Sequence, residues 1–103
     1  MSVTTEQTTT RDVTIVNAKG LHARASAKFV TQAEKWDADV TVTYGDETVS
    51  ACSIMGLMLL GAGIGATISL SARGPQAEVA LDALVSLVAT GFGEDDGDAA
   101  TAV

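Results

Sequence analysis

The residues that could do chemistry in this 103-residue chain are few, and two of them lie close together. His22 is the only histidine, and Arg24 follows two positions later. A neutral imidazole nitrogen is a nucleophile near pH 7, and a guanidinium group binds two phosphate oxygens at once. The pair therefore indicates a histidine that could accept a phosphoryl group beside an arginine that could hold its charge.

The chain around His22 fits the same chemistry. Gly20 permits a sharp turn just before the histidine, and a helix is expected over residues 22–36. The first amide groups of a helix have no partner within it and lie at the positive end of its dipole, so they favour an anion. These would be the backbone amides of Ala23, Arg24 and Ala25. A histidine that only caps the helix, or only lies at the surface, fits these residues equally well.

Two other motifs point to no chemistry of their own. The stretch "GAGIGA" (61–66) matches G-x-G-x-x-A, but it follows an expected helix and precedes an expected strand, the reverse of a dinucleotide site, so we interpret it as a flexible turn. The only cysteine, Cys52, excludes an internal disulfide and fits a reducing compartment. Its apolar neighbours predict a small buried side chain, and no metal site is expected around it.

Hydrophobic periodicity predicts the elements that must position His22. Strands are expected over 11–17, 38–44, 47–51 and 66–72, with a two-residue type II′ turn at 45–46. Helices are expected over 22–36, over 54–60 with Ser53 as N-cap, and after Pro75. The last helix has an apolar stripe formed by Leu81, Leu84, Val85, Val88 and Phe92. The order β-α-β-β-α-β-α predicts an α/β open-faced sandwich, with one mixed four-stranded sheet and three helices on one face.

Charge and length restrict the class of protein. The net charge of −7 argues against nucleic acid and anionic membranes as partners. Residues 1–35 carry five basic and three acidic residues, whereas residues 36–103 carry one and ten, so a basic patch is expected near His22. The uncharged run 48–72 alternates at its end like a strand, so it is not expected to cross a membrane. We expect one domain over 12–93, a flexible tail over 1–11, an acidic disordered tail over 94–103, and no secretory signal.

Two separate segments carry a resemblance to a known family. The stretches "GLHARASAKFV" (20–30) and "SIMGLMLLGAGIGATISLSARGPQAEVALDALVSLVATGFGE" (53–94) resemble HPr, the histidine phosphocarrier family of the phosphoenolpyruvate:phosphotransferase system. The likeness runs from about residue 12 to residue 94. It implies the βαββαβα open-faced sandwich and a cytoplasmic phosphocarrier without a cofactor, which we expect to be a monomer.

The resemblance also implies roles for particular residues. His22 corresponds to the histidine that is phosphorylated at Nδ1, and Arg24 to the arginine that assists transfer. Ser53 corresponds to the serine that HPr kinase/phosphorylase modifies in some members. The apolar patch on which partners dock corresponds to Ile54, Met55 and Met58. Core packing is the alternative for these three; we expect Met55 and Met58 to be at least partly exposed and Ile54 to be shared between core and surface.

One position departs from the family pattern. The usual H-A-R-P motif has alanine in place of proline here, at Ala25. Alanine restores a backbone donor in the first turn, where proline has none. The H-A-R-A-S form also resembles nitrogen-related branches of the system, so sugar transport and nitrogen regulation both stay open.

The expected function is transfer of a phosphoryl group from Enzyme I to His22 and then to an EIIA-type protein. Two other classes remain as alternatives. One is a non-phosphorylated regulatory adaptor of the same fold, and the other is a small sensor or ligand-binding domain of similar topology.

Overall fold

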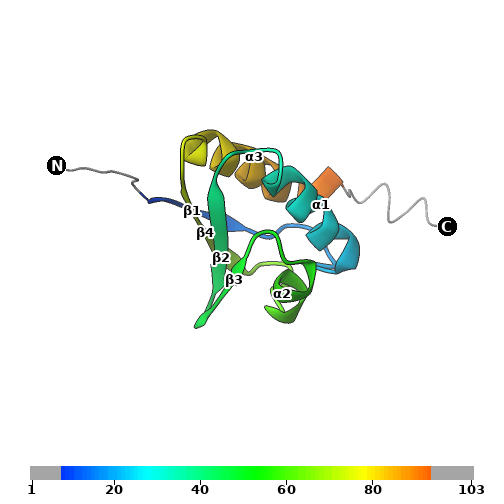
Figure 1. The fold of residues 1–103 in the computed structure, drawn as a ribbon. Coiled ribbons are helices and arrows are strands. Elements are labelled where there is room, and N and C mark those ends of the chain that lie inside the picture. The colour runs from blue at the N-terminus through cyan, green and yellow to red at the C-terminus, as the bar shows by residue number, and fades with distance from the viewer. Residues whose placement is uncertain (1–7, 94–103) are drawn as a thin grey trace.

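The expected order of elements is present in the computed structural model, which describes residues 8–93. The strands are β1 (Thr9–Thr14), β2 (Asp39–Tyr44), β3 (Glu47–Ser50) and β4 (Thr67–Arg73). The helices are α1 (Ala23–Ala33), α2 (Ile54–Leu59) and α3 (Ala77–Ala89), and a short 3-10 turn, η1 (Gly91–Gly93), follows α3. All three helices lie on one face of the sheet, and its other face is left uncovered (Figure 1). This is the predicted open-faced sandwich.

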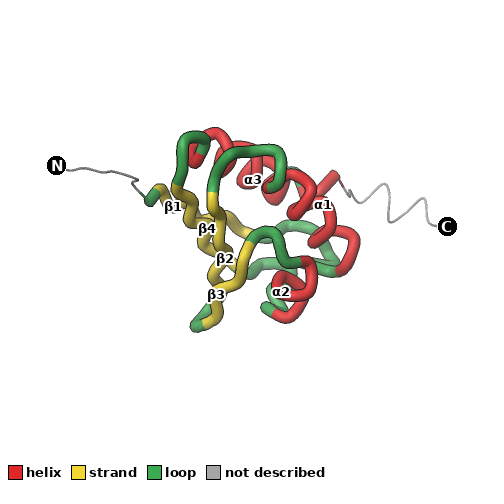
Figure 2. Tube along the Cα trace, in the orientation of Figure 1, coloured by secondary structure: helices red, strands yellow, loops and turns green. Residues whose placement is uncertain are grey.

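The sheet is antiparallel throughout, so the expectation of a mixed sheet was wrong. The strand order is β1-β4-β2-β3, and each neighbouring pair is antiparallel. Each of the two helical crossovers, β1-α1-β2 and β3-α2-β4, joins two strands that run in the same direction (Figure 2). Those two strands are not neighbours, because each crossover skips one position and an antiparallel strand fills the gap between them.

Two of the local predictions are confirmed at atomic detail. Tyr44 pairs with Glu47 across a two-residue turn, and Gly45 takes the positive φ of 62° that such a turn needs. Ser53 is the N-cap of α2, and its Oγ accepts a hydrogen bond of 2.9 Å from the backbone N–H of Gly56.

Some element boundaries differ from the predictions. β1 begins at Thr9 rather than residue 11, because Thr9 and Thr10 pair with Ala72 and Ser71 of β4. Part of the expected N-terminal tail is therefore sheet, while residues 1–7 and 94–103 lie outside the described part of the chain. α1 ends at Ala33 instead of 36, since the following amides bond three residues back in a tighter turn.

Phe92 was wrongly placed in the last helix. α3 ends at Ala89, and Phe92 lies in η1 with a φ of +61°. The side chain is still buried, at 1% exposure, so the prediction that Phe92 belongs to the core was correct. Only the prediction that its backbone is helical was wrong. Gly91 on one side and Gly93 on the other also have positive φ, which lets the chain turn back toward α1.

The core lies between the sheet and the helices. Alternate residues of β2 and β4 face it, including Val42, Ile68 and Leu70, each with no exposed surface. Each such side chain contributes about 1.5–3 kcal/mol by leaving water. The residues between them face the uncovered side, where Ser69 donates to Asp12 and Thr and Ser hydroxyls pair across the strands.

The uncharged run 48–72 forms the end of β3, α2, a loop and most of β4. Within residues 8–93, every helix is too short or too polar to cross a membrane.

Candidate functional site

His22 lies at the start of α1 as its N-cap. Its backbone is extended, with φ −74° and ψ −179°, and its carbonyl accepts the first helical hydrogen bond, 2.8 Å from the N–H of Ser26. The imidazole makes no capping bond to the helix amides, so a side-chain cap, one of the alternatives open from the sequence, is wrong. The half-buried histidine therefore lies beside the helix N-terminus without occupying it.

The amides of Ala23, Arg24 and Ala25 form the first turn of α1. A helix offers these groups no carbonyl four residues earlier, because the helical ladder begins with the bond from Ser26 to His22. Three N–H donors and the positive end of the helix dipole thus follow His22 directly in the chain. This is the arrangement that favours a phosphate group.

The turn before His22 is held by one side-chain and two backbone hydrogen bonds. Asn17 donates from Nδ2 to the carbonyl of Gly20 at 3.0 Å, and its own carbonyl accepts from the N–H of Gly20 at 3.1 Å. Leu21 then donates its N–H to the carbonyl of Ala62 at 3.1 Å. The histidine is therefore fixed from two directions, by its own turn and by a loop distant in the sequence.

Gly20 is required at the centre of this turn. Its φ is +62°, and a Cβ added there would lie 2.5 Å from the carbonyl oxygen of Ala62 and 2.6 Å from Cα of Gly63. The "GAGIGA" loop, interpreted from sequence as a flexible turn, is a support for the segment that carries His22.

Sequence reasoning missed three residues of this support. Ser26 is fully buried, and its Oγ donates to the carbonyl of Leu21 at 3.1 Å. Asn17 is also buried, and Ala62 supplies the carbonyl bonded by Leu21. Only Asn17, as the first residue of an N-A-K-G turn, left a local signal.

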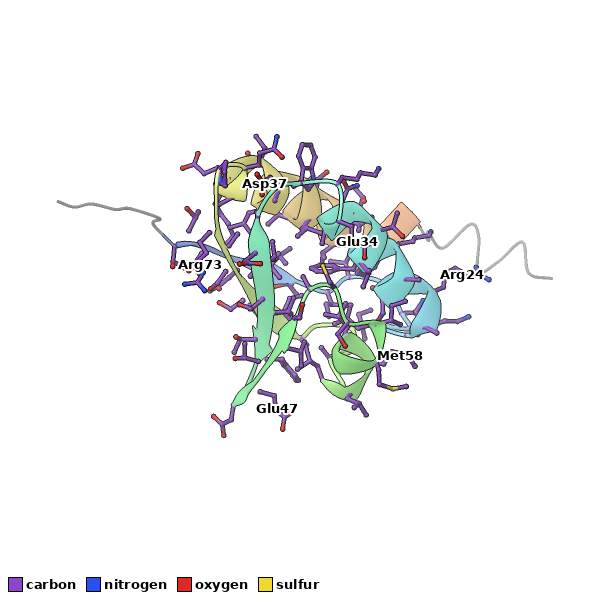
Figure 3. The ribbon with its side chains drawn as sticks, viewed as in Figure 1. Arg24, Glu34, Asp37, Glu47, Met58 and Arg73 are labelled. Atoms are coloured by element: carbon purple, nitrogen blue, oxygen red, sulfur yellow. The ribbon has the colours of Figure 1, made fainter. Side chains whose placement is uncertain are left out.

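Arg24 is exposed on α1 and extends into solvent (Figure 3). The flexible side chain leaves its guanidinium free to swing toward the helix N-terminus, where His22 lies. Ala25, by contrast, buries its methyl group completely in the core. At this position only the backbone N–H is left for chemistry.

The first residues of the 53–94 segment form α2, which exposes most of its apolar side chains. Ile54, Met55 and Met58 are 41%, 63% and 39% exposed, so core packing is wrong for them. We call these three residues the apolar patch; Met58 is labelled on α2 in Figure 3. Leu59 of α2 and Ile64 of the loop that follows it, which were not predicted, are exposed by 73% and 62%. An exposed group of large apolar residues is typical of a protein interaction site.

Cys52 is exposed, so the prediction of a buried side chain was wrong. The neighbouring Ala51 takes the buried position instead. Among the described residues, no three His, Cys, Asp or Glu side chains come together as a metal site.

The fold and this geometry define a class: open-faced sandwiches with a histidine at a helix N-terminus beside an apolar helix. The family model described as "PTS HPr component phosphorylation site" matches residues 9–90. The chain therefore belongs to the HPr family of phosphocarrier proteins of the phosphotransferase system.

Individual relatives agree with that family. The chain is 48% identical to the phosphocarrier protein HPr of Cupriavidus necator over 84% of its length and 97% of the relative's. It is 45% identical to the phosphocarrier protein NPr of Shewanella violacea over 82% and 92%. The structure resembles HPr of Thermoanaerobacter tengcongensis with a TM-score of 0.81 and 41% identity, covering 84% of this chain and 98% of that one.

Proposed function

We propose that His22 carries a phosphoryl group from phospho-Enzyme I to a histidine of an EIIA-type protein. The observation that supports this most strongly is the position of the only histidine, which is the N-cap of α1 beside three helix-start amides. In the first step Nδ1 of His22 attacks phosphorus, and the bond from phosphorus to Enzyme I breaks as the new P–N bond forms. The second step repeats this exchange with His22 as the leaving group.

The helix N-terminus favours the charged intermediate over the empty carrier. A negative group at such a site gains about 0.3–1 kcal/mol, and up to about 2 kcal/mol where it is partly buried. Arg24 adds a full positive charge to the group in flight. This stabilisation is modest, which suits a carrier that must release the group again.

Incubation with Enzyme I and phosphoenolpyruvate tests the proposal. Acid-labile, alkali-stable phosphate should appear on the wild type and be lost in His22→Ala, with Arg24→Ala as a variant that keeps the acceptor but slows transfer. Label on His22→Ala would overturn the site. Unlabelled wild type would favour the adaptor, and binding of a small molecule without label would favour the sensor.

Partners would dock on the apolar patch next to the site. The exposure of Ile54, Met55 and Met58 supports this, since a helix of six residues that buries only Leu57 leaves its other apolar side chains for a partner. We place the carrier in the cytoplasm, as a monomer that needs no cofactor. Supplying EIIA-type proteins of the sugar and nitrogen branches separately would show which branch accepts the group.

Ser53 is proposed as a site for HPr kinase/phosphorylase. Its half-buried hydroxyl lies at the N-terminus of α2, directly before Ile54 and Met55, so a phosphate there would place a dianion beside the apolar patch and weaken docking. Incubation with the kinase and ATP, followed by mass mapping, tests this with Ser53→Ala as control. Lack of modification at Ser53 would leave only its role as a helix cap.

A further inference from the structure

A basic groove runs along α1 and begins at Arg24. Arg24, Lys28 and Lys35 line it together with Leu87 of α3. Arg24 and Lys28 are four residues apart and lie on one face of α1, and Lys35 lies two residues beyond the end of the helix. α1 contains no acidic residue, although Glu34 and Asp37 follow it, and the residues that line the groove include three cations and no carboxylate in a chain whose net charge is −7.

The described chain ends beside the middle of this groove. Lys28 donates from Nζ to the carbonyl oxygen of Phe92 at 2.7 Å, and a Cβ at Gly93 would lie 3.9 Å from the same Nζ. Phe92, Gly91 and Gly93 all have left-handed backbone conformations, which are costly for a bulky residue such as phenylalanine. The fold thus accepts backbone strain in a turn that brings Gly93 close to Lys28.

The next residues have the complementary charge. Glu94, Asp95, Asp96 and Asp98 place four carboxylates within five positions. Five extended residues reach about 17 Å. Along the axis of α1, Lys28 is only about 6 Å from Arg24 and about 7.5 Å from Ala33, which precedes Lys35 by two residues. Either end of the groove is therefore within reach.

We propose that the acidic segment 94–98 binds the basic groove of its own chain. Direct attachment at Gly93 gives the segment an effective concentration in the millimolar range, so weak ion pairs are enough to keep it bound much of the time. Leu87 gives the groove an apolar wall, which reduces the screening of these ion pairs by water and salt. A segment bound there would lower the positive potential that an acidic partner would meet near Arg24.

Paramagnetic relaxation tests the binding in the full chain. A nitroxide is attached at Ala99→Cys in a Cys52→Ser background, because Cys52 is an exposed thiol that would also react. Amides along α1 from residue 24 to residue 35 should broaden at low salt, and those of the turn at 45–46 should not. Replacing all four carboxylates (E94Q, D95N, D96N and D98N) should reduce this broadening at least about threefold, as should 0.5 M salt, roughly a Debye length of 4 Å.

A matched pair of variants separates binding from net charge. E94Q/D95N should lower the broadening, whereas D46N/E47Q, which removes the same two types of charge at the β2–β3 turn, should leave it unchanged. Equal broadening with the acidic and the neutral tail would overturn the proposal, because a tail that only moves freely near Lys28 does not depend on charge. Broadening that appears only between labelled and unlabelled molecules in a mixture would overturn it too, since the segment would then bind a second copy.

The consequence for transfer rests on the proposed function. If partners approach Arg24, neutralising the segment should raise kcat/KM with Enzyme I about threefold at low salt, and the gain should vanish at high salt. A chain that accepts no phosphate with either tail would refute the proposed function, while the relaxation result would still decide whether the segment binds the groove.

Discussion

At the scale of single residues, the turn that carries His22 depends on Gly20 and on the backbone conformation that glycine allows. Gly20 and Gly45 both have a φ of +62°, but only at Gly20 would a Cβ meet other atoms. Gly45→Ala should therefore cost about 1 kcal/mol for its backbone conformation alone. Gly20→Ala should cost about 3 kcal/mol, because the clash with the carbonyl of Ala62 is added. Urea denaturation measures both, and equal losses would show that the contact with the 61–66 loop does not hold the turn.

Ala25 is the residue that departs from the usual motif, and its amide is the feature to test. We expect that this N–H donates to the phosphoryl group on His22, which proline could not do. Ala25→Pro should speed hydrolysis of the phosphorylated protein about tenfold, the loss of one hydrogen bond to a charged group. The measurement is the decay of the labelled protein at neutral pH, with thermal unfolding to check that the helix persists. Identical decay of the two proteins would remove the hypothesis.

At the scale of elements, substitutions of Ser53, the N-cap of α2, can distinguish its effect on stability from its proposed effect on regulation. Ser53→Ala should lower the free energy of unfolding by about 1 kcal/mol, because the N–H of Gly56 loses its acceptor. Ser53→Asp should lose less, since a carboxylate also caps a helix and interacts well with its dipole. The aspartate should nevertheless weaken transfer from Enzyme I by placing charge beside the apolar patch. If the alanine and aspartate variants lose transfer equally, charge is not the cause.

The exposed side chains of α2 should matter for partners and not for folding. Met55→Ser should raise KM for transfer about tenfold while changing the free energy of unfolding by less than about 0.5 kcal/mol. Val79→Ser provides the control, because Val79 is an exposed apolar residue, 46% accessible, on α3 rather than α2. An equal rise in KM for both variants would mean that docking is not localised on α2.

The elements themselves were largely predictable from local pattern. Alternation of apolar and polar residues identifies β2 and β4, because one face of each strand is buried and the other is open. The cap at Ser53 and the turn at Gly45 follow from the chemistry of single residues. The antiparallel strand order and the tighter turn at the end of α1 could not be predicted from local pattern. Both depend on tertiary contacts with the rest of the fold.

The candidate site was predictable only in part. His22 and Arg24 carry recognisable chemistry, but the carbonyl of Ala62 and the buried hydroxyl of Ser26 acquire their roles through tertiary contacts. Cys52 was misplaced because the neighbouring alanine turns inward in its stead. Phe92 was assigned to the right layer and the wrong conformation, because hydrophobicity predicts burial and says little about a left-handed turn.

At the scale of the whole molecule, the helical layer of the open-faced sandwich contains two separate features, the N-terminus of α1 and the exposed helix α2. The N-terminus of α1 holds the histidine, and α2 exposes the apolar patch on which we propose that partners dock. The core beneath both is continuous, with Ala25 and Leu57 fully buried in the same cluster. His22 and the apolar patch are therefore fixed relative to each other by packing, so a partner bound to the patch would meet His22 in a defined orientation.

The most direct test of the proposal that His22 carries the phosphoryl group is to identify the atom that bonds phosphorus in the phosphorylated chain. Nitrogen-15 and phosphorus-31 NMR of the protein after incubation with Enzyme I and phosphoenolpyruvate distinguishes the two imidazole nitrogens of the single histidine. We expect one phosphohistidine, with phosphorus bonded to Nδ1 of His22 and the amide signals of residues 23–25 shifted on phosphorylation. Phosphorus on Nε2, on another residue, or absent from the wild type would contradict it.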